Sequence, residues 1–402
     1  MSNRKQALHI IRKLRQEGFE ALLAGGCVRD RLLKRPASDY DVATDATPKE
    51  VMRMFGRTLK IGAKFGVVMV LLDGRQVEVA TFRTEGGYAD GRRPGYVAFA
   101  SAREDAARRD FTVNGMFYDP VTDSLHDFVG GQADLRAKII RTIGDPGQRF
   151  SEDYLRMLRA VRFAVKLDFE IEPATWTSIT AHADKLSAIS AERIAAELEE
   201  ILTHPNRRRG GELLFASGLV RAIFAEFTDT TAQKALAVLE RLPRAVSFGL
   251  AMAAFCVGLP TAAALTLCRQ LKLSNAAIKH IRFLLTYRGA LCETEMSLSR
   301  LKLLMYEPYF TDLMKLERAI VKAEGKSLRP LNAINKRAEA IDPAAVHPEP
   351  LLDGHTLIAM GAAPGPMVGR LAQELYIAQL EEHLKTPAQA KRWATEWLAE
   401  HR

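Results

Sequence analysis

A glycine pair and two aspartates near the start of the chain are the residues most suited to chemistry. The pair is Gly25-Gly26, followed by Arg29, Asp39 and Asp41. A glycine pair that opens a helix leaves backbone N–H groups accessible to an oxyanion, because no Cβ blocks its approach. Two aspartates at i and i+2 on a strand present both carboxylates on one face, and Mg²⁺ shares such oxygens with a nucleoside triphosphate. The spacing therefore predicts metal-dependent nucleotidyl transfer, the alternative being a turn followed by a solvated acidic strand.

A second cluster combines two arginines with an aspartate and an asparagine. Arg108 and Arg109 supply forked donors for triphosphate oxygens. Asp110 is placed to orient one of them, and Asn114 to bind a ribose hydroxyl or the backbone. The alternative for this segment is the solvated start of a basic helix.

A third cluster lies on a predicted helix over residues 151–163. Its apolar stripe leaves Asp153, Arg156 and Arg159 on the opposite side, with Arg162 at the border. Asp153 and Arg156, at i and i+3, are expected to be neighbours. A carboxylate beside a guanidinium matches the amino donor and ring-nitrogen acceptor of cytosine and adenine, and mismatches uracil and guanine. The alternative is an ordinary salt bridge within a surface helix.

The elements that position these clusters divide the chain into two parts. Up to about residue 145, helical and strand patterns alternate. The clearest signals are a capping box at Thr47 and Glu50, a hairpin turning at Asp73-Gly74, and a strand over 39–43. From Glu152 onward strand signals nearly vanish. The sequence predicts an α/β head followed by an all-α extension.

Composition limits the class of protein. The 402 residues exceed one typical core, so two to four domains are expected. Four scattered cysteines indicate reduced thiols rather than zinc or disulfides. No apolar run approaches the ~18 to 20 residues of a membrane span, and no secretory signal opens the chain, so a cytoplasmic protein is expected. The net charge of +9 favours a polyanionic partner.

In their order and spacing, the three clusters resemble the class II tRNA nucleotidyltransferases and the bacterial poly(A) polymerases related to them. Further segments carry the same resemblance: Val79–Arg83, Asp145–Asp153 and Asp353–Pro366. The resemblance implies an α+β polymerase-beta-like nucleotidyltransferase head with a mixed sheet, then an all-α neck, body and tail. The expected domains are a catalytic head (1–145), a neck with the nucleotide-selecting template (146–205), a body (206–300) and a tRNA-binding tail (301–402).

The resemblance also implies roles for individual residues. Asp39 and Asp41 would be catalytic and bind two Mg²⁺ ions, with Glu78 or Asp110 as a third carboxylate. The nucleotide would be bound by the following residues: Gly26, Arg29, Arg109, Asp153, Arg156, Arg159 and Arg162.

The implied activity is template-independent addition of C, C and A, from CTP and ATP, to the 3′ end of tRNA. Alternatives are A addition alone, poly(A) synthesis, or an RNA-binding protein on an inactive scaffold. A glycine-rich loop over 83–95 argues for A addition. Candidate RNA contacts are the basic run 207–209, the basic pair of Lys315 and Arg318, and the turn at 364–366, each of which could equally be a solvated surface.

Overall fold

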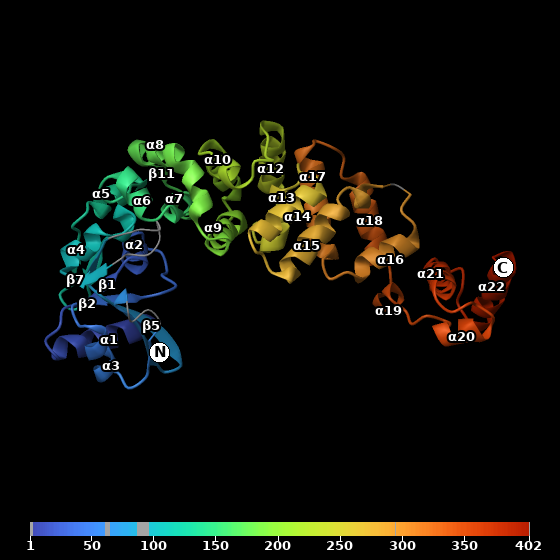
Figure 1. The fold of residues 1–402 in the computed structure, drawn as a ribbon, viewed down its shortest axis with the longest axis horizontal. Helices are drawn as coiled ribbons and strands as arrows, with labels where there is room; N and C mark the ends of the chain where they lie inside the picture. Colours follow the sequence, from blue (N-terminus) through green and yellow to red (C-terminus); the bar gives the residue numbers. More distant parts are fainter. Residues whose placement is uncertain (1–2, 61–64, 87–95, 294, 402) are drawn as a thin grey trace. The chain divides into compact units, whose positions relative to one another are not determined.

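The computed structural model describes residues 3–60, 65–86, 96–293 and 295–401. Its contacts divide the chain into two compact units, and Figure 1 labels the helices and strands in chain order. The first unit runs to Thr228 and includes Arg269–Leu273, and the second comprises Asp229–Cys268 and the chain from Ser274. The four domains expected from the sequence stay a prediction.

The first unit contains a seven-stranded sheet in the order β3-β4-β5-β2-β1-β8-β9. Its strands are β1 (Ala21–Ala24), β2 (Asp41–Thr44), β3 (Thr58–Leu59), β4 (Val67–Leu72), β5 (Arg75–Thr81), β8 (Phe117–Asp119) and β9 (Ser124–His126). Strands β2 and β5 pair in parallel, whereas the other neighbours are antiparallel. The predicted mixed sheet is therefore confirmed.

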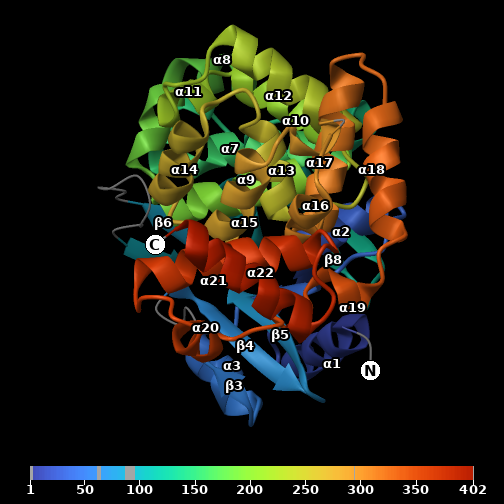
Figure 2. The same cartoon turned by 90° about the vertical axis from the view of Figure 1, so that its right-hand side faces the viewer.

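Local signals in the head are confirmed as predicted. Asp73 and Gly74 both adopt positive φ, 47° and 73°, and join β4 to β5 as the hairpin visible in Figure 2. The Thr47 side chain accepts from the Glu50 N–H, while Glu50 caps Thr47 in return, so helix α3 (Pro48–Met54) begins where expected.

The strand predicted over 39–43 begins two residues later than expected. Strand β2 starts at Asp41, which pairs with Ala24, the last residue of β1. Gly25 follows with φ 70° and turns the chain away, so Asp39 has no strand opposite it. The i, i+2 argument for Asp39 and Asp41 is therefore wrong, because only Asp41 lies on the strand.

Helices and short strands complete the first unit. The helices are α1 (Asn3–Gln16), α2 (Gly26–Leu32), α4 (Ala102–Ala107), α5 (Gly131–Ala137), α6 (Pro146–Glu152), α7 (Leu155–Leu167), α8 (Pro173–His182), α9 (Ala191–Thr203), α10 (Arg207–Ala216) and α11 (Leu219–Ile223). Two small sheets pair β6 (Arg83–Gly86) with β7 (Tyr96–Phe99) and β10 (Ile139–Ile140) with β11 (Glu170–Ile171).

The helix predicted over 151–163 is two helices. Helix α6 ends at Glu152 and α7 begins at Leu155. Between them Asp153 is extended, with φ −155°, and its carboxylate accepts from the Leu155 N–H at 3.1 Å. An aspartate placed in this way satisfies a backbone donor at the start of the second helix.

The second unit is built from helices. They are α12 (Asp229–Arg241), α13 (Phe248–Phe255), α14 (Thr261–Gln270), α15 (Asn275–Thr286), α16 (Leu298–Tyr306), α17 (Phe310–Ala323), α18 (Arg329–Glu339), α19 (Pro343–Val346), α20 (Gly354–Ala359), α21 (Pro366–Leu380) and α22 (Pro387–Glu400). Among the described residues β11 is the last strand, which confirms the all-α extension. None of the helices in these ranges combines the length and apolar character that crossing a membrane needs. All four cysteines are free; three are buried and Cys292 is partly exposed.

A buried carboxyl group in the second unit gives a testable pH dependence. Glu317 on α17 is 1% exposed and accepts hydrogen bonds from the Gly289 N–H and the Cys292 thiol. Burial raises its pKa from 4.5 to about 7. Because the folded state holds this proton more tightly than the unfolded chain, the associated stability is complete below about pH 4.5 and is lost as the pH rises toward 7.

The variant Glu317→Gln should not lose stability in this way as the pH rises. Between pH 5 and 8, urea denaturation of the wild type should show a decrease in unfolding free energy that exceeds the variant's by roughly 2–3 kcal/mol. Glu396→Gln, which changes an exposed glutamate of α22 in the same unit, serves as the control and should follow the wild type. Parallel curves for the wild type and Glu317→Gln would contradict the prediction.

Candidate active site

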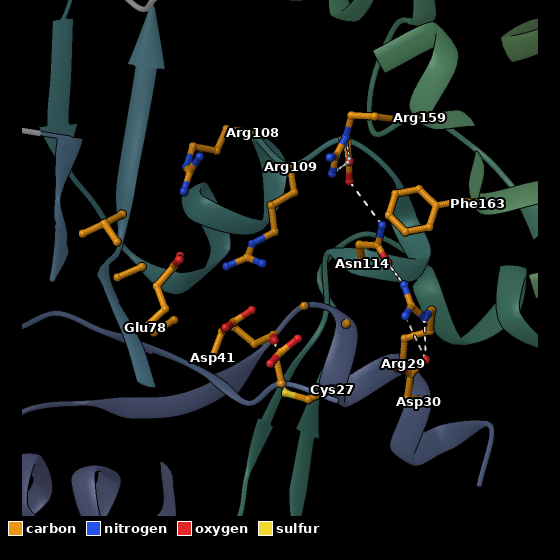
Figure 3. A pocket seen from close by; sticks show the side chains of 18 of the residues that line it. Cys27, Arg29, Asp30, Asp41, Glu78, Arg108, Arg109, Asn114, Arg159 and Phe163 are labelled. Carbon is orange, nitrogen blue, oxygen red and sulfur yellow. Dashed lines mark hydrogen bonds and ion pairs between the residues drawn. The ribbon is translucent and has the colours of Figure 1, made fainter. Parts of the chain in front are cut away.

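A cavity of about 500 Å³ in the first unit collects nearly all of the predicted site residues (Figure 3). Its polar and glycine lining comprises Gly25, Gly26, Cys27, Arg29, Asp30, Ser38, Asp39, Asp41, Glu78, Arg83, Arg108, Arg109, Asp110, Asn114, Asp153, Arg156, Arg159, Lys166 and Arg193. Arg162 is the one predicted residue that does not line it. The cavity thus joins the three sequence clusters.

The glycine pair lies at the turn from β1 into α2. Gly25 has φ 70° and ψ −130°, a conformation that is open to glycine and strained for other residues. A Cβ on Gly25 would lie 3.2 Å from Nη1 of Arg109, whereas one on Gly26 would meet only Nη2 of Arg29 at 3.6 Å. The backbone at Gly25 is therefore where glycine is required.

We expect Gly25→Ala to destabilise the protein by about 1–3 kcal/mol, because alanine strains this backbone and crowds Arg109. Gly26→Ala, at the neighbouring position, should change the unfolding free energy by less than about 1 kcal/mol, since the helix accepts alanine there. Chemical denaturation of both variants measures the difference. Equal losses in the two variants would refute the strain argument.

Two carboxylates from neighbouring parallel strands enter the cavity. Val42 on β2 pairs with Val79 on β5, so the preceding residues, Asp41 and Glu78, are adjacent, and Figure 3 shows both side chains reaching the same part of the cavity. Burial and then the charge of Glu78 raise the pKa of Asp41 to about 6; Asp39 adds to the rise, against the opposing effect of Arg109. The site thus concentrates negative charge that a cation would relieve.

The hydrogen bonds of Asp110 favour Glu78 over Asp110 as the third carboxylate. Asp110 accepts from Arg159 Nε and Nη2 at 2.9 and 2.6 Å and from the Phe111 N–H at 2.8 Å. Although burial raises the pKa of Asp110, Arg159 outweighs it and holds the pKa below its usual value. A carboxylate paired in this way has little capacity left for a metal ion.

The carboxylate oxygens around Asp41 could supply part of the ligand shell of a hard cation. Carboxylate oxygens are ligands that Mg²⁺ accepts, and proteins commonly supply one or two of them while substrate phosphates complete the shell. Within the described residues, no three His, Cys, Asp or Glu side chains form a complete metal site on their own. The arrangement suits a metal ion shared between protein and triphosphate.

The arginines of the second cluster are held by an aspartate that the sequence analysis missed. Asp105 on α4 has a side chain only 2% exposed and accepts from Arg108 Nε at 2.9 Å and from Arg109 Nη2 at 2.9 Å. The expectation that Asp110 orients one of the two arginines is wrong, since Asp110 pairs with Arg159. The helical spacings of three and four residues from Asp105 could have revealed this partner.

A chain of polar contacts runs from Arg29 to Asp110. Arg29 is 4% exposed, and donates from Nε to Asp30 at 2.8 Å and from Nη1 to the Asn114 amide oxygen at 2.7 Å. The Asn114 amide then donates to Asp110 at 3.4 Å. Both Arg29 and Asn114 line the cavity, but these contacts occupy polar groups that a nucleotide would otherwise use.

The expected pair of Asp153 and Arg156 is not formed. The Arg156 guanidinium donates from Nη1 to Glu152 at 2.5 Å and to the Arg149 carbonyl at 2.9 Å. Asp153 instead accepts from Arg193 on α9, at 2.6 and 3.2 Å. The neighbour prediction is wrong because Asp153 lies between two helices rather than on one, yet both side chains line the cavity.

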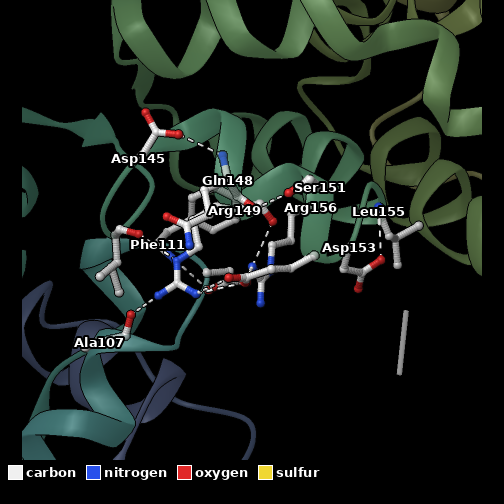
Figure 4. A network of polar contacts seen from close by, with 12 residues as sticks. Ala107, Phe111, Asp145, Gln148, Arg149, Ser151, Asp153, Leu155 and Arg156 are labelled. Carbon is white, nitrogen blue, oxygen red and sulfur yellow. Dashed lines mark hydrogen bonds and ion pairs between the residues drawn. The ribbon is translucent and has the colours of Figure 1, made fainter. Parts of the chain in front are cut away.

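Arg149 fixes the segment that carries Arg156, as Figure 4 shows. It donates to the carbonyls of Ile143 and Ala107 and, at 2.8 Å, to the Glu152 carboxylate. Glu152 therefore receives two guanidinium groups and links them. No local signal in the sequence pointed to Arg193, which is 40 residues from its partner.

Two other predictions concerning basic residues need correction. Arg162 lies outside the cavity because its Nε donates to Glu197 at 2.6 Å and its guanidinium stacks 4.3 Å from the Phe163 ring centroid. Arg207, a candidate RNA contact, is 2% exposed and donates to the carbonyls of Leu202 and Thr203. Most of the glycine-rich loop, residues 87–95, lies outside the described residues.

Comparisons with known proteins agree with this geometry. Three family profiles match: the Poly A polymerase head domain over residues 21–141, a probable RNA and SrmB-binding site of polymerase A over 168–230, and a putative tRNA nucleotidyltransferase domain 2 over 248–391.

Curated relatives extend the agreement along the chain. The CCA-adding enzyme of Streptococcus gordonii is 34% identical over 394 residues, which cover 96% of this chain and 95% of that protein. The CCA-adding enzyme of Geobacillus stearothermophilus is 45% identical over 216 residues, 54% of this chain and about half (53%) of the relative's length.

A crystal structure of the Bacillus stearothermophilus CCA-adding enzyme in complex with CTP is similar to this chain along its whole length. It superposes with a TM-score of 0.83 and 29% identity, covering 100% of this chain and 99% of that one.

Proposed function

We propose that this chain, which belongs to the family of CCA-adding enzymes, acts as those tRNA nucleotidyltransferases do. It would add C, C and A to the 3′ end of tRNA from CTP and ATP. The observation that carries the proposal is the single cavity that joins Asp41 and Glu78 to the arginines of two further clusters. No RNA template is needed if protein side chains choose the base.

We assign the metal-binding role to Asp39 and Asp41, with Glu78 as third carboxylate. Nucleotidyltransferases of this kind use a divalent metal, and Mg²⁺ suits the oxygen donors. When bound, Mg²⁺ would activate the RNA 3′-hydroxyl and neutralise charge on the leaving pyrophosphate. Asp41 is fixed by β2, and it meets Glu78 across the parallel pairing with β5.

The triphosphate is assigned to the turn at Gly25-Gly26 and to Arg109. The Gly25 N–H donates to the Met116 carbonyl at 3.3 Å, so the N–H groups of Gly26 and Cys27 at the start of α2 are the ones that would donate to the triphosphate. Asp105 orients the Arg109 guanidinium through two hydrogen bonds, from Nε at 3.1 Å and from Nη2 at 2.9 Å. Arg29, being buried and occupied by Asp30 and Asn114, would position this region rather than contact phosphate.

The base is assigned to Asp153 and Arg156, each held from a different direction. Arg193 orients Asp153, and Glu152 orients Arg156. Oδ1 of Asp153 accepts from both Arg193 and Leu155, whereas Oδ2 accepts from Arg193 alone and keeps a lone pair for the amino group of cytosine or adenine. Arg156 uses Nη1 for Glu152 and Arg149, so its Nη2 would donate to the ring nitrogen. Arg159, paired with Asp110, would steady the same wall. A cytoplasmic location, where tRNA is used, belongs to the same proposal.

The decisive experiment offers purified protein and Mg²⁺ three tRNAs that end before CCA, after C and after CC. Labelled CTP and ATP are supplied separately and together, with an unstructured RNA as control. Addition of three residues followed by arrest is the expected result. Addition of A alone to the CC-ended tRNA would indicate an A-adding enzyme, and long A tails on the control RNA a poly(A) polymerase. No incorporation anywhere would overturn the proposal.

A further inference from the structure

Arg149 contacts both sides of the active site although its own side chain does not line the cavity. It lies on α6, and 15% of the side chain is exposed. Its guanidinium donates to the backbone carbonyl of Ala107, from Nε to that of Ile143 at 2.8 Å, and to the Glu152 carboxylate. Because the side chain lies outside the cavity, any effect on the reaction must pass through these partners.

The two carbonyls belong to the part of the site that is assigned to the triphosphate. Ala107 is the last residue of α4, a position whose carbonyl has no partner within the helix. That helix carries Asp105, which holds the Arg109 guanidinium. The Ile143 N–H donates to the carbonyl of the residue that follows Arg109. Arg149 is therefore bonded twice to the segment that positions Arg109.

The carboxylate belongs to the part of the site that is assigned to the base. The two oxygens of Glu152 accept from Arg149 Nη1 at 3.1 and 2.8 Å, and one of them also accepts from Arg156 Nη1 at 2.5 Å. The same nitrogen of Arg156 donates to the Arg149 carbonyl at 2.9 Å. Figure 4 shows Arg149 between Ala107 and Arg156. One guanidinium thus joins the support of the triphosphate arginine to the support of the base arginine.

The planar guanidinium is what allows one side chain to bridge both supports. Its N–H donors point in fixed directions, so the bonds to Ala107, Ile143 and Glu152 are made together. Lysine carries the same charge on a single ammonium group and cannot reproduce this fork. The bridge therefore fixes a geometry in addition to supplying a charge.

We propose that Arg149 is a positioning residue that sets the spacing between Arg109 and Arg156 and thereby aligns the base of the nucleotide with its triphosphate. This inference rests on the proposed function, in which the two arginines bind opposite ends of CTP or ATP. A nucleotide whose base is bound while its α-phosphate is misplaced reacts slowly, because a displacement of about 1 Å can lower a rate about a hundredfold. The bridge makes correct base pairing a condition for rapid transfer.

The test compares two substitutions of Arg149 with a matched arginine outside the site. Arg149→Gln removes both the charge and the fork, whereas Arg149→Lys keeps the charge. The control Arg15→Gln removes an arginine of the same unit that pairs with Asp119 at 2.6 Å and does not line the cavity. For each variant of the full chain, kcat and KM are measured for CTP and UTP on a tRNA lacking CCA, together with inhibition by inorganic tripolyphosphate and the melting temperature.

Both Arg149 variants should lower the ratio of kcat/KM for CTP over UTP about tenfold, mainly through a lower kcat for CTP, because UTP gains nothing from the alignment. Inhibition by tripolyphosphate, which reports the triphosphate subsite alone, should stay close to that of the wild type, since Asp105 still holds Arg109. The Arg15→Gln control should melt at a lower temperature and keep the wild-type base preference. Wild-type preference in a folded Arg149→Gln protein, full rescue by Arg149→Lys, or an equal loss in the control would overturn the inference.

A double variant shows whether Arg149 acts through Arg156. In an Arg156→Ala background, Arg149→Gln should cause no further loss of base preference, because residues that act as a unit have non-additive effects. Losses that multiply would mean that the two residues act independently and would contradict the bridge. An Arg156→Ala variant that keeps the CTP preference would contradict it too, since Arg149 would then have no base-reading group to position.

Failure of the proposed function gives a different result from failure of this inference. A wild-type protein that adds nothing to any tRNA contradicts the function itself. A wild-type protein that completes CCA, combined with an Arg149→Gln variant that prefers CTP as the wild type does, contradicts only the role of Arg149.

Discussion

Replacing Asp41 by asparagine should lower incorporation of CMP and AMP by roughly a thousandfold or more while the protein keeps its fold. The Asp41 carboxylate is the metal ligand that β2 is proposed to supply. Loss of about 4 kcal/mol of transition-state stabilisation by the metal ion lowers the rate about a thousandfold. Asparagine keeps the shape of the side chain, so the loss reports the charge. Single-turnover transfer from labelled CTP to a tRNA lacking CCA measures the effect.

The stability of the same variant provides an independent check. Burial and the neighbouring Glu78 raise the pKa of Asp41 to about 6, so the folded protein loses stability as the pH rises from about 4 to 6 and this carboxylate ionises. Without divalent metal at pH 8, Asp41→Asn should therefore melt at a higher temperature than the wild type. Adding Mg²⁺ should raise the melting temperature of the wild type more than that of the variant.

Glu78→Gln and Asp110→Asn separate the two candidates for the third carboxylate. Glu78→Gln should reduce transfer with little change in melting temperature. Asp110→Asn should lower the melting temperature, because it weakens the pairing of a largely enclosed carboxylate, 11% exposed, with Arg159. Substantial transfer by Asp41→Asn would refute the metal assignment, whatever the behaviour of the other two.

The parts of the fold that the sequence predicted correctly depend on neighbours along the chain. The hairpin at Asp73-Gly74 needs two residues that accept positive φ, and the capping box at Thr47 needs a glutamate three residues later. Both conditions are visible in a short window of sequence. That residues of all three clusters serve one site was implied by the family resemblance rather than by any local signal, and the cavity brings them together.

The errors arose where a distant contact decided the local geometry. Asp39 falls outside the strand because β1 ends at Ala24, and a strand extends only as far as its partner. Asp153 leaves the helix to cap α7 and pairs with Arg193, a residue on another helix. Arg162 was assigned to the nucleotide, yet Glu197, 35 residues away, holds it elsewhere. Spacing along one helix cannot reveal a partner on a second helix.

The structure indicates which side chains would select the base. Arg156→Ala should therefore strongly reduce the preference for CTP over UTP. Discrimination between CTP and UTP, measured as the ratio of kcat/KM values, should fall about 10- to 100-fold, since a mispaired buried group costs roughly 1–3 kcal/mol. The KM for the triphosphate should change less, because Arg109 and the turn at Gly25 are assigned to the phosphates. Competition between labelled CTP and UTP on one tRNA measures the ratio.

A matched arginine on the same helix controls for the loss of charge. Arg162 pairs with Glu197 outside the cavity, so Arg162→Ala should keep the CTP preference even if its stability falls. Glu152→Gln should weaken the preference in the same direction as Arg156→Ala, because Glu152 is the carboxylate that holds the Arg156 guanidinium at 2.5 Å. If Arg156→Ala still rejects UTP as the wild type does, Arg156 does not read the base. Base choice would then have to rest on Asp153 and Arg193, another charged pair that lines the cavity.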